Sequence, residues 1–400
     1  MLRSLFSGIT GLRQHQTLMD VVSNNIANVN TTGFKGSTTT FEDTLSQTLR
    51  NAGLPTQGLG GLNPAQIGLG VQLGGITTNF RQGSAQNTGR TTDLMIQGDG
   101  FFVLENGVQQ SFSRAGAFNF DTNGTLVNAE GMRVQGWMAD ATGVINSDGP
   151  MEDILVPAGT MIPPVATETV TMAGNITSGS ATALTLGATV YDKSGVAHSV
   201  SIVLTPSGST FGVAVTDLTD GTSVATAGTL AFTGTGGYDA TNSTAADLTL
   251  ADGSVIDFDM TGASLYGGPK SLSVTSVDGS SAGSLQQFQI QQDGTIVGVF
   301  SNQQKMSLGK LAMANFTNPS GLEKVGNTAF VQTSNSGLPQ IGVAGAGGRG
   351  TLLASTLEMS NVDLAQEFTN MIIAQRGFQA NSRVITTSDQ MLQELVDLKR

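Results

Sequence analysis

Apolar residues recur at helical spacing at both ends of the chain. In the N-terminal stretch MLRSLFSGITGLRQHQTLMDVVSNNIA they follow a three–four spacing, which predicts an amphipathic helix. Near the C-terminus they repeat every seven positions, at Leu364, Met371, Phe378, Ile385 and Leu392. Phe368 fills the alternate position, and a heptad sustained in this way is typical of a coiled coil. A capping box of Ser360 and Asp363 predicts the start of this second helix.

Amide side chains interrupt the apolar stripe of the first predicted helix. Asn24, Asn25 and Asn28 fall within its last turns, although asparagine is a poor helix former. The two helices could form a hairpin that only supports the core of one chain, but such a hairpin leaves further apolar residues exposed. We favour copies of the hairpin packed around an axis. The predicted polymerisation interface comprises Leu5, Ile9, Leu12, Met19, Asn24, Asn25, Ile26, Asn28, Leu364, Phe368, Met371, Phe378, Ile385 and Leu392.

Between the two ends the apolar period changes to two, which predicts short β-strands. Turns are marked by Asn106-Gly107, by the run Asp121 to Gly124, and by Asp293-Gly294. The composition shifts from about residue 160 to 284 towards Thr, Ser, Ala and Gly. In this acidic part Lys193 is the only basic residue between Arg133 and Lys270.

These patterns predict a multi-domain, mainly β protein with a nested domain insertion. Its paired N- and C-terminal α-helices are expected to form a coiled-coil-like core. The expected parts are a helical assembly domain (1–32 with 352–400), an extended linker or loop (33–70), an inner β domain (71–160 with 285–351) and an inserted outer acidic β domain (161–284).

Composition and charge narrow the class of protein. The chain has 400 residues, 53 glycines, 12% charged and 6% aromatic residues, as in β-rich structural proteins. A net charge of −12 argues against nucleic acid as a partner, and the absence of cysteine excludes disulfides and thiolate metal sites. No apolar run is long enough for a membrane span, and no standard secretory signal is recognisable. We expect either a cytoplasmic protein or export that reads an uncleaved terminus.

The candidate chemical motifs are weak. GAGGRG, residues 345–350, fits a dinucleotide fingerprint, but the heptad helix follows it where a second strand is needed. GSSAG, residues 279–283, resembles a nucleophile elbow, but both histidines precede it. Asp121 and Asn123 resemble the start of a calcium loop, but the acidic residue that closes such a loop is missing. Asp257 and Asp259 lie on one face of a predicted strand, and we expect that face to be solvated. We therefore expect no catalytic, cofactor or metal site.

Several segments resemble the bacterial flagellar rod and hook proteins. They are LFSGITGLRQHQTLMDVVSNNIANVNTTGFKGS at the start, TDLMIQGDGFFVL and RAGAFNFDTNGTLVNAEGMRVQGW in the first β domain, and STLEMSNVDLAQEFTNMIIAQRGFQANSRVITTSDQMLQELVDL at the end. VYDKSGVAHSVSIVL, residues 190–204, resembles the start of the outer domain of hook proteins, which the shorter rod proteins lack.

The resemblance implies a structural subunit of the flagellar hook. Such a subunit assembles with copies of itself into a curved tube that transmits torque while bending. Implied partners are rod proteins, the hook cap, hook–filament junction proteins and the flagellar type III export apparatus, with no membrane insertion. The location implied is the flagellum outside the cell, and Asn24, Asn25 and Asn28 would bond between subunits or face the channel. Two alternatives stay open, a distal rod subunit and a secreted β-rich adhesin with a coiled-coil stalk.

Overall fold

The chain forms two compact units. The computed structural model describes residues 2–55, 60–157, 159–208, 210–219 and 224–397, without the side chains of residues 2, 224 and 395. The first unit combines Met1–Val156, Gln289–Ile296 and Ser307–Arg400, and the second combines Pro157–Phe288 and Val297–Met306. The first unit is therefore assembled from segments far apart in the sequence, which confirms the predicted nested insertion.

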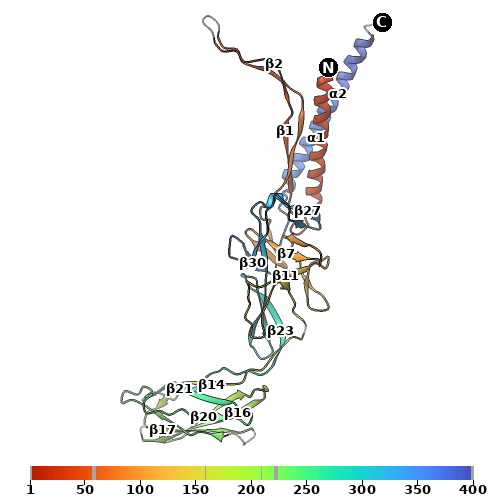
Figure 1. The fold of residues 1–400 in the computed structure, drawn as a ribbon. Coiled ribbons are helices and arrows are strands. Elements are labelled where there is room, and N and C mark those ends of the chain that lie inside the picture. The colour runs from red at the N-terminus through yellow and green to blue at the C-terminus, as the bar shows by residue number, and fades with distance from the viewer. Residues whose placement is uncertain (1, 56–59, 158, 209, 220–223, 398–400) are drawn as a thin grey trace. The chain divides into compact units, whose positions relative to one another are not determined.

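The two predicted helices are present and pack against each other. They are α1 (Leu2–Ala27) and α2 (Leu364–Asp397) (Figure 1). Gly8 faces Ile385 and His15 faces Gly377, so the two helices run antiparallel. Asp363 Oδ1 accepts the backbone N–H groups of residues 365 and 366, which makes Asp363 the N-cap of α2 rather than Ser360. No described helix is both long and apolar enough to cross a membrane.

Small residues dominate the contact between the helices. The fully buried residues of the pair are Gly8, Gly11, Val22, Asn25, Ala374 and Ser388. A Cβ atom added to Gly11 would come within 2.6 Å of Asn381 Nδ2, and one added to Gly377 would overlap the His15 ring. We call Gly8, Gly11, Ala374, Gly377 and Ser388 the small-residue seam. Close backbone approach at this seam leaves larger side chains beside the contact or outside it.

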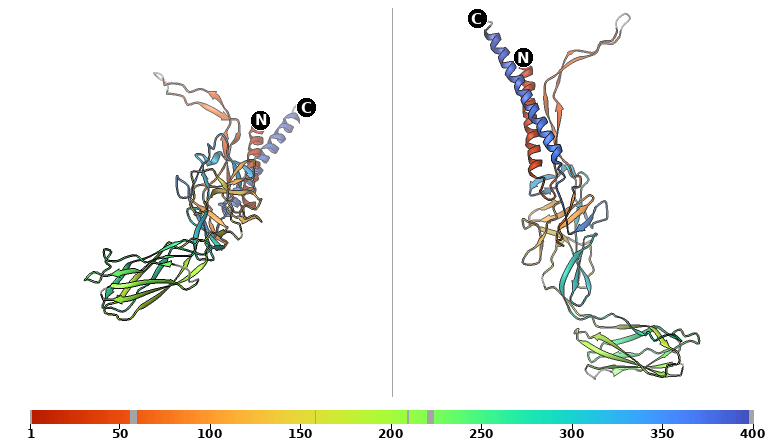
Figure 2. Two further views of the ribbon diagram at one scale, coloured as in Figure 1. Left: turned by 60° about the horizontal axis from the view of Figure 1, so that its bottom comes forward. Right: turned by 180° about the vertical axis from the view of Figure 1, so that it is seen from behind.

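Residues 33–70 do not form the expected extended linker. Strands β1 (Ser37–Asp43) and β4 (Val71–Thr78) pair antiparallel, as do β2 (Ser46–Arg50) and β3 (Ala65–Gly68). Together they form a two-stranded ribbon that begins beside α1 (Figure 2). The ring centroids of His15 on α1 and Phe41 on β1 lie 6.3 Å apart. Threonine and other β-forming residues on both strands explain the pairing. The Gly- and Pro-rich centre of the segment includes residues 56–59, which lie outside the described residues.

A β domain completes the first unit. Its central sheet has the order β25 (Lys305–Leu311), β11 (Arg133–Met138), β7 (Phe101–Glu105), β8 (Gln110–Ser113), β28 (Ala329–Val331) and β27 (Glu323–Gly326). Smaller pairings involve β5 (Ala85–Asn87), β6 (Leu94–Gln97), β9 (Asn119–Phe120), β10 (Leu126–Val127), β12 (Glu152–Asp153), β26 (Met313–Asn315), β29 (Gln340–Gly342), β30 (Thr351–Ala354) and β31 (Thr356–Glu358). A short 3-10 helix spans Pro319–Gly321. The core of this β domain is aromatic and includes Phe101, Phe112, Trp137, Phe316 and Phe330.

The second unit is built around two sheets with a shared apolar core. One sheet has the order β15 (Leu184–Tyr191), β16 (Ala197–Ser207), β17 (Thr210–Asp217) and β19 (Gly228–Ala231). The other has the order β18 (Val224–Ala225), β20 (Asp247–Thr249), β21 (Val255–Tyr266), β14 (Thr169–Thr177) and β22 (Ser273–Val277). In β16, Val200, Ile202 and Leu204 alternate inward, which confirms the period of two.

Three further strands and three turns complete the description. The strands are β13 (Met161–Ile162), β23 (Gly283–Ile290) and β24 (Thr295–Phe300). The predicted turns are confirmed: β7 and β8 join at Asn106-Gly107, β9 and β10 at Asp121–Gly124, and β23 and β24 at Asp293-Gly294. The three glycines have φ of 83°, 86° and 84°, a left-handed conformation that favours glycine.

The small-residue seam predicts that Gly377→Ala destabilises the helix pair. In an exposed helix, replacing glycine by alanine would stabilise the helix by about 1 kcal/mol through helix propensity alone. At Gly377 the new methyl group overlaps the His15 ring, so we expect a net loss of about 1–3 kcal/mol in the stability of the helix pair. Thermal unfolding followed by far-ultraviolet circular dichroism measures it.

Two further variants complete this test. Exposed Gln379→Ala should leave the unfolding of the helices nearly unchanged. Adding His15→Ala to Gly377→Ala removes the overlapping ring, so it should recover stability relative to the single variant. A stabilised single Gly377→Ala variant would show that the helices do not meet at this glycine.

Candidate assembly interface

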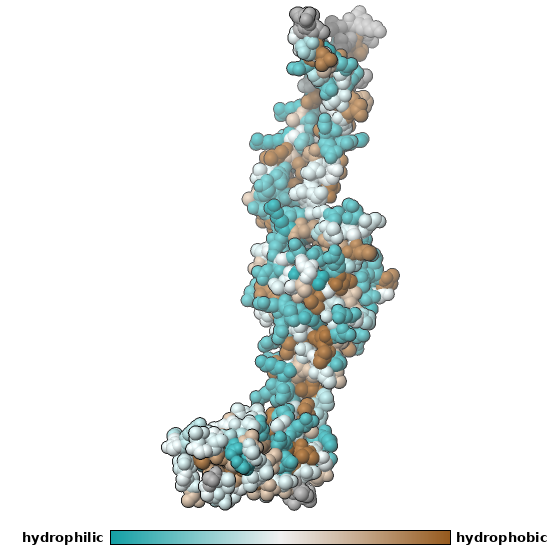
Figure 3. Space-filling model, turned by 60° about the vertical axis from the view of Figure 1, so that its left-hand side comes forward, coloured by the Kyte–Doolittle hydropathy of each residue, from teal (hydrophilic) through white to brown (hydrophobic). Residues whose placement is uncertain are grey.

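Large apolar side chains remain exposed on both helices after the helices have paired. Phe6 is 64% exposed on α1, and Ile373 is 57% and Val396 69% exposed on α2. The other large apolar side chains that are exposed on the described part of the pair are Ile9, Leu364, Phe368, Ile372, Phe378, Val384 and Met391. Apolar patches interrupt the polar surface of the molecule (Figure 3). Exposed apolar surface of this extent is typical of a surface that another molecule covers.

The predicted interface residues do not form one cluster within the chain. Ile9, Leu364, Phe368 and Phe378 are exposed. Leu5, Leu12, Met19, Ile26, Asn28, Met371, Ile385 and Leu392 are half-buried beside the helix contact. Phe378 is 37% exposed, so it is not a buried seam residue of the monomer. The heptad thus marks residues that flank the small-residue seam or face outward from it.

Asn25 differs from its expected role between subunits. Its Nδ2 donates to the Ser37 carbonyl at 2.8 Å and its Oδ1 accepts from the Ser37 N–H at 3.0 Å. Nδ2 also lies 3.3 Å from Glu367 Oε1. The buried amide therefore satisfies the first residue of β1 within the same chain. An asparagine fits here because one amide offers both a donor and an acceptor to a backbone.

Asn24 and Asn28 form a local pair at the end of α1. Asn28 Nδ2 donates to the Asn24 carbonyl and to Asn24 Oδ1, both at 2.9 Å, while Thr31 donates to Asn28 Oδ1 at 3.1 Å. Both asparagines also line a groove of about 400 Å³ with Phe34 and Lys324. Burial lowers the pKa of Lys324, whose ammonium lies 5.1 Å from the Phe34 ring centroid. Of the three asparagines, these two are the ones that reach an open surface.

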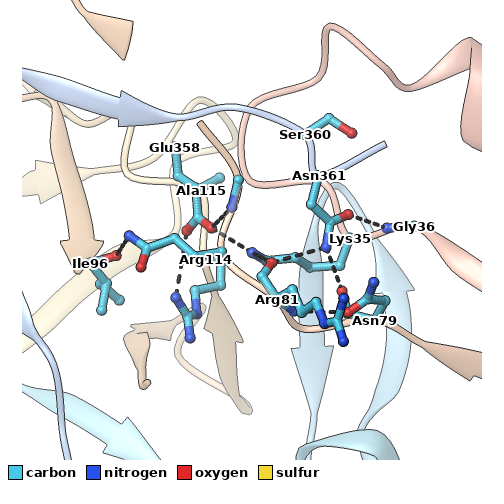
Figure 4. A network of polar contacts seen from close by, with 12 residues as sticks. Lys35, Gly36, Asn79, Arg81, Ile96, Arg114, Ala115, Glu358, Ser360 and Asn361 are labelled. Carbon is cyan, nitrogen blue, oxygen red and sulfur yellow. Dashed lines mark hydrogen bonds and ion pairs between the residues drawn. The ribbon is translucent and has the colours of Figure 1, made fainter. Parts of the chain in front are cut away.

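A buried ionic cluster fastens the helices and the ribbon to the β domain. Lys35 Nζ lies 2.5 Å from Glu358 Oε1, and Arg114 Nη1 lies 3.6 Å from Glu358 Oε2. Figure 4 shows both cations directed at the one carboxylate. Lys35 follows α1, Glu358 ends the strand before α2, and Arg114 follows β8. We call Lys35, Arg114, Glu358 and Asn361 the junction network.

Hydrogen bonds extend the junction network to the chain that leaves the ribbon. Lys35 Nζ also donates to the Arg81 carbonyl at 2.9 Å, and the Gly83 N–H donates to Glu358 Oε1 at 2.9 Å. Asn361 Nδ2 donates to the carbonyl of Asn79 at 2.7 Å and of Arg81 at 2.9 Å (Figure 4). Every segment that joins the helices and ribbon to the β domain is thus held at one place.

Burial controls the electrostatics of this network. It lowers the pKa of Lys35, and the nearby Glu358 carboxylate opposes that shift. The pKa of Arg114 is lowered for the same reason, with Glu358 and Asp99 opposing. Neither side chain of the Lys35–Glu358 pair is exposed, so the loss of the carboxylate would leave Lys35 buried without an anion and Arg114 with only the weaker attraction of Asp99.

Nothing in the sequence periodicity indicates the junction network. The one available signal is that Lys35 and Glu358 are isolated charges in a chain with only 12% charged residues, next to turns and helix ends.

The segment that superficially resembles a calcium loop is a turn between two strands. Its Asp121 Oδ1 accepts the N–H groups of Asn123 at 2.9 Å and Thr125 at 2.7 Å. Within the described residues, no three His, Cys, Asp or Glu side chains cluster as metal ligands would.

Three family profiles match successive parts of the chain. Residues 5–35 match the flagella basal body rod protein family, residues 95–178 the flagellar hook protein FlgE/F/G D1 domain, and residues 353–398 the flagellar basal body rod FlgEFG protein C-terminal domain. The first and third matches cover most of the two helices, and the second covers strands of both units. The fold and the paired termini are those of a flagellar axial protein.

Full-length relatives agree with these profiles. The chain is 40% identical to the flagellar hook protein FlgE of Treponema pallidum, with 100% of both chains covered. It is 32% identical to the flagellar basal-body rod protein FlgG of Bacillus subtilis, again over 100% of both. The crystal structure of Helicobacter pylori flagellar hook protein FlgE2 matches with a TM-score of 0.53 and 14% identity, covering 68% of this chain and 100% of that one. This chain belongs to the family of flagellar hook and basal-body rod proteins, whose members are located in the bacterial flagellum.

The junction network predicts a large effect of Glu358→Gln. Removing the one carboxylate between Lys35 and Arg114 should lower the free energy of unfolding of the first unit by about 3–5 kcal/mol. Trp137 is the single tryptophan and lies in the core of this unit, so its fluorescence in denaturant reports the loss. Exposed Asp389→Asn is the control. A loss below about 1 kcal/mol would mean that water or another anion compensates the two cations.

Proposed function

We propose that this protein is a structural subunit of the bacterial flagellar hook. Copies of the chain polymerise through their terminal helices into a helical tube that transmits torque from the rod to the filament and bends as it turns. Its role is mechanical and not catalytic. Its further partners are rod proteins, the hook cap and hook–filament junction proteins, and the flagellar type III export apparatus carries it to the outside of the cell.

The exposed apolar side chains of the helix pair carry this proposal. Each large apolar side chain that a neighbour covers contributes about 1.5–3 kcal/mol. The side chains of Phe6, Phe368 and Ile372 are each at least half exposed on the monomer. Other copies of the same helix pair would bury them at every position of a helical polymer, since each copy presents the same surfaces.

The division of labour between the units follows from their surfaces. The first unit combines exposed apolar helices with the junction network, and this combination suits strong inner contacts that carry torque. The inserted unit is acidic, with Lys193 the only basic residue between Arg133 and Lys270. Like charges on neighbouring copies favour weak, exchangeable contacts, which bending requires.

A distal rod subunit is the second candidate. The Bacillus subtilis rod relative supports it, because it matches over its whole length. The higher identity to the Treponema pallidum hook protein and the large inserted unit favour the hook. Electron microscopy of the polymerised protein decides between them: short curved tubes support the hook subunit, straight stiff tubes support the rod subunit, and no tubes at all would contradict both.

Phe378→Asp should prevent polymerisation while the monomer still folds. Phe378 is 37% exposed, so the monomer tolerates a carboxylate there, but a neighbouring copy that covers it would bury an unpaired charge at a cost of several kcal/mol. Sedimentation measures assembly and circular dichroism measures folding. Gln379→Asp adds the same charge at the next, exposed position and is the control. Normal tubes from Phe378→Asp would remove Phe378 from the interface.

Excision of most of the inserted unit should preserve tubes and change their curvature. Val165 and Ser280 exchange backbone hydrogen bonds at 3.0 and 2.9 Å, so residues 166–279 leave and return at adjacent points. A short Gly-Ser linker can join them. The helices remain, and we expect polymers that are straight or irregularly bent in electron micrographs. Unchanged curvature would move the bending function out of residues 166–279, and loss of all tubes would place assembly contacts within them.

A further inference from the structure

A small pocket lies where α1, α2 and β1 meet. Its volume is about 200 Å³. Its apolar lining is Leu18, Val21 and Val22 from α1 and Ile373 from α2. Its polar lining is residues 37–39 of β1 with Glu367 and Asn370 of α2. All of these residues belong to the first unit, in the helical part that the proposed function assigns to assembly.

Two buried acceptors in this pocket have no hydrogen-bond partner. They are Glu367 Oε2 and Thr39 Oγ1. The other carboxylate oxygen, Glu367 Oε1, is close to Asn25 Nδ2 at 3.3 Å. Burial raises the pKa of Glu367, and the charge of Asp363 adds to the rise, while the amides of Asn25 and Asn370 oppose it. Within the described residues no cation forms an ion pair with this carboxylate. A buried acceptor without a partner is destabilising, and more so when it is charged.

The same helices carry cations without carboxylate partners. Four exposed arginines on α1 and α2 form no ion pair among the described residues: Arg3, Arg13, Arg376 and Arg383. One chain therefore presents an anionic pocket without a cation and cations without an anion. Copies packed side by side through these helices can satisfy both.

We propose that the Glu367 pocket receives an arginine from the helices of a second copy of this chain. An arginine side chain fits both parts of the lining, because its methylene stem packs on Leu18, Val21 and Ile373. Its planar guanidinium offers several N–H donors, enough for Glu367 Oε2 and Thr39 Oγ1 together. This inference rests on the proposed function, since it names one contact within the proposed polymer.

The test is a conservative substitution followed by charge exchange. Glu367→Gln keeps an acceptor for Asn25 and removes the charge, so the monomer should fold normally by circular dichroism. The critical concentration for polymerisation should rise roughly tenfold or more, because the second copy's guanidinium loses its carboxylate. Glu394→Gln, an exposed acid on the same helix, is the matched control and should assemble as the unmodified chain does.

Charge exchange identifies the partner residue. Glu367→Arg should block assembly, and combining it with the right one of Arg3→Glu, Arg13→Glu, Arg376→Glu or Arg383→Glu should restore tubes. If Glu367→Gln assembles at the normal concentration, the proposal is overturned. That result is the one expected if water alone fills the pocket. Failure of all four charge exchanges to restore tubes would also overturn the proposal. So would an exchange that restores only the thermal stability of the monomer, because the ion pair would then lie within one chain. In each case tubes from the unmodified chain leave the proposed hook function standing.

Discussion

The close approach of α1 and α2 at the small-residue seam is the constraint on which the rest of the first unit depends. Glycine, alanine and serine at the contact let the two backbones come together, as the positions of Gly11 and Gly377 demonstrate. Ile385 packs against Gly8 and Val22 is buried in the pair, whereas the larger Phe368 and Phe378 remain at the edges of the contact or outside it. One geometric requirement therefore stabilises the hairpin within a chain and at the same time leaves apolar surface for other chains.

The junction network gives this arrangement a mechanical consequence. A load carried by the helices reaches the β domain through the segments that leave α1, the ribbon and β31, and Lys35, Glu358 and Asn361 bind all three together. A buried ion pair adds little net stability compared with apolar packing, but removing one partner is costly. Such a pair therefore favours one arrangement of the segments over alternatives. That property suits a part that transmits force without slipping.

The sequence predicted the elements better than the contacts between them. Helical period, period-two strands and Asn-Gly or Asp-Gly turns depend on local chemistry, and the structure confirms them. The glycines of the seam, Gly8, Gly11 and Gly377, interrupt the predicted helices and so indicate that another backbone comes close. Ala374 and Ser388 carry no periodic apolar signal, while the heptad side chains beside them do, so the sequence did not indicate these two. The ribbon was missed, because the Gly- and Pro-rich centre of residues 33–70 obscured the threonine-rich strand at its edge. Asn25 was misassigned, because its partner Ser37 is met only after the chain has turned back. Pairings such as Lys35 with Glu358 join residues over 300 positions apart, and no local pattern encodes them.

The two kinds of surface in the helical part act differently in assembly. Apolar contact is strong but not directional, so exposed phenylalanine, isoleucine and valine side chains would hold copies together without fixing their register. A buried carboxylate that lacks a cation in the monomer is directional, because it is satisfied only when a donor reaches one position. A polymer subunit needs both properties, since a tube must cohere and also keep one helical register under torque. The apolar faces of α1 and α2 meet the first need, and the Glu367 pocket, with its orphaned oxygen beside Thr39, is suited to the second.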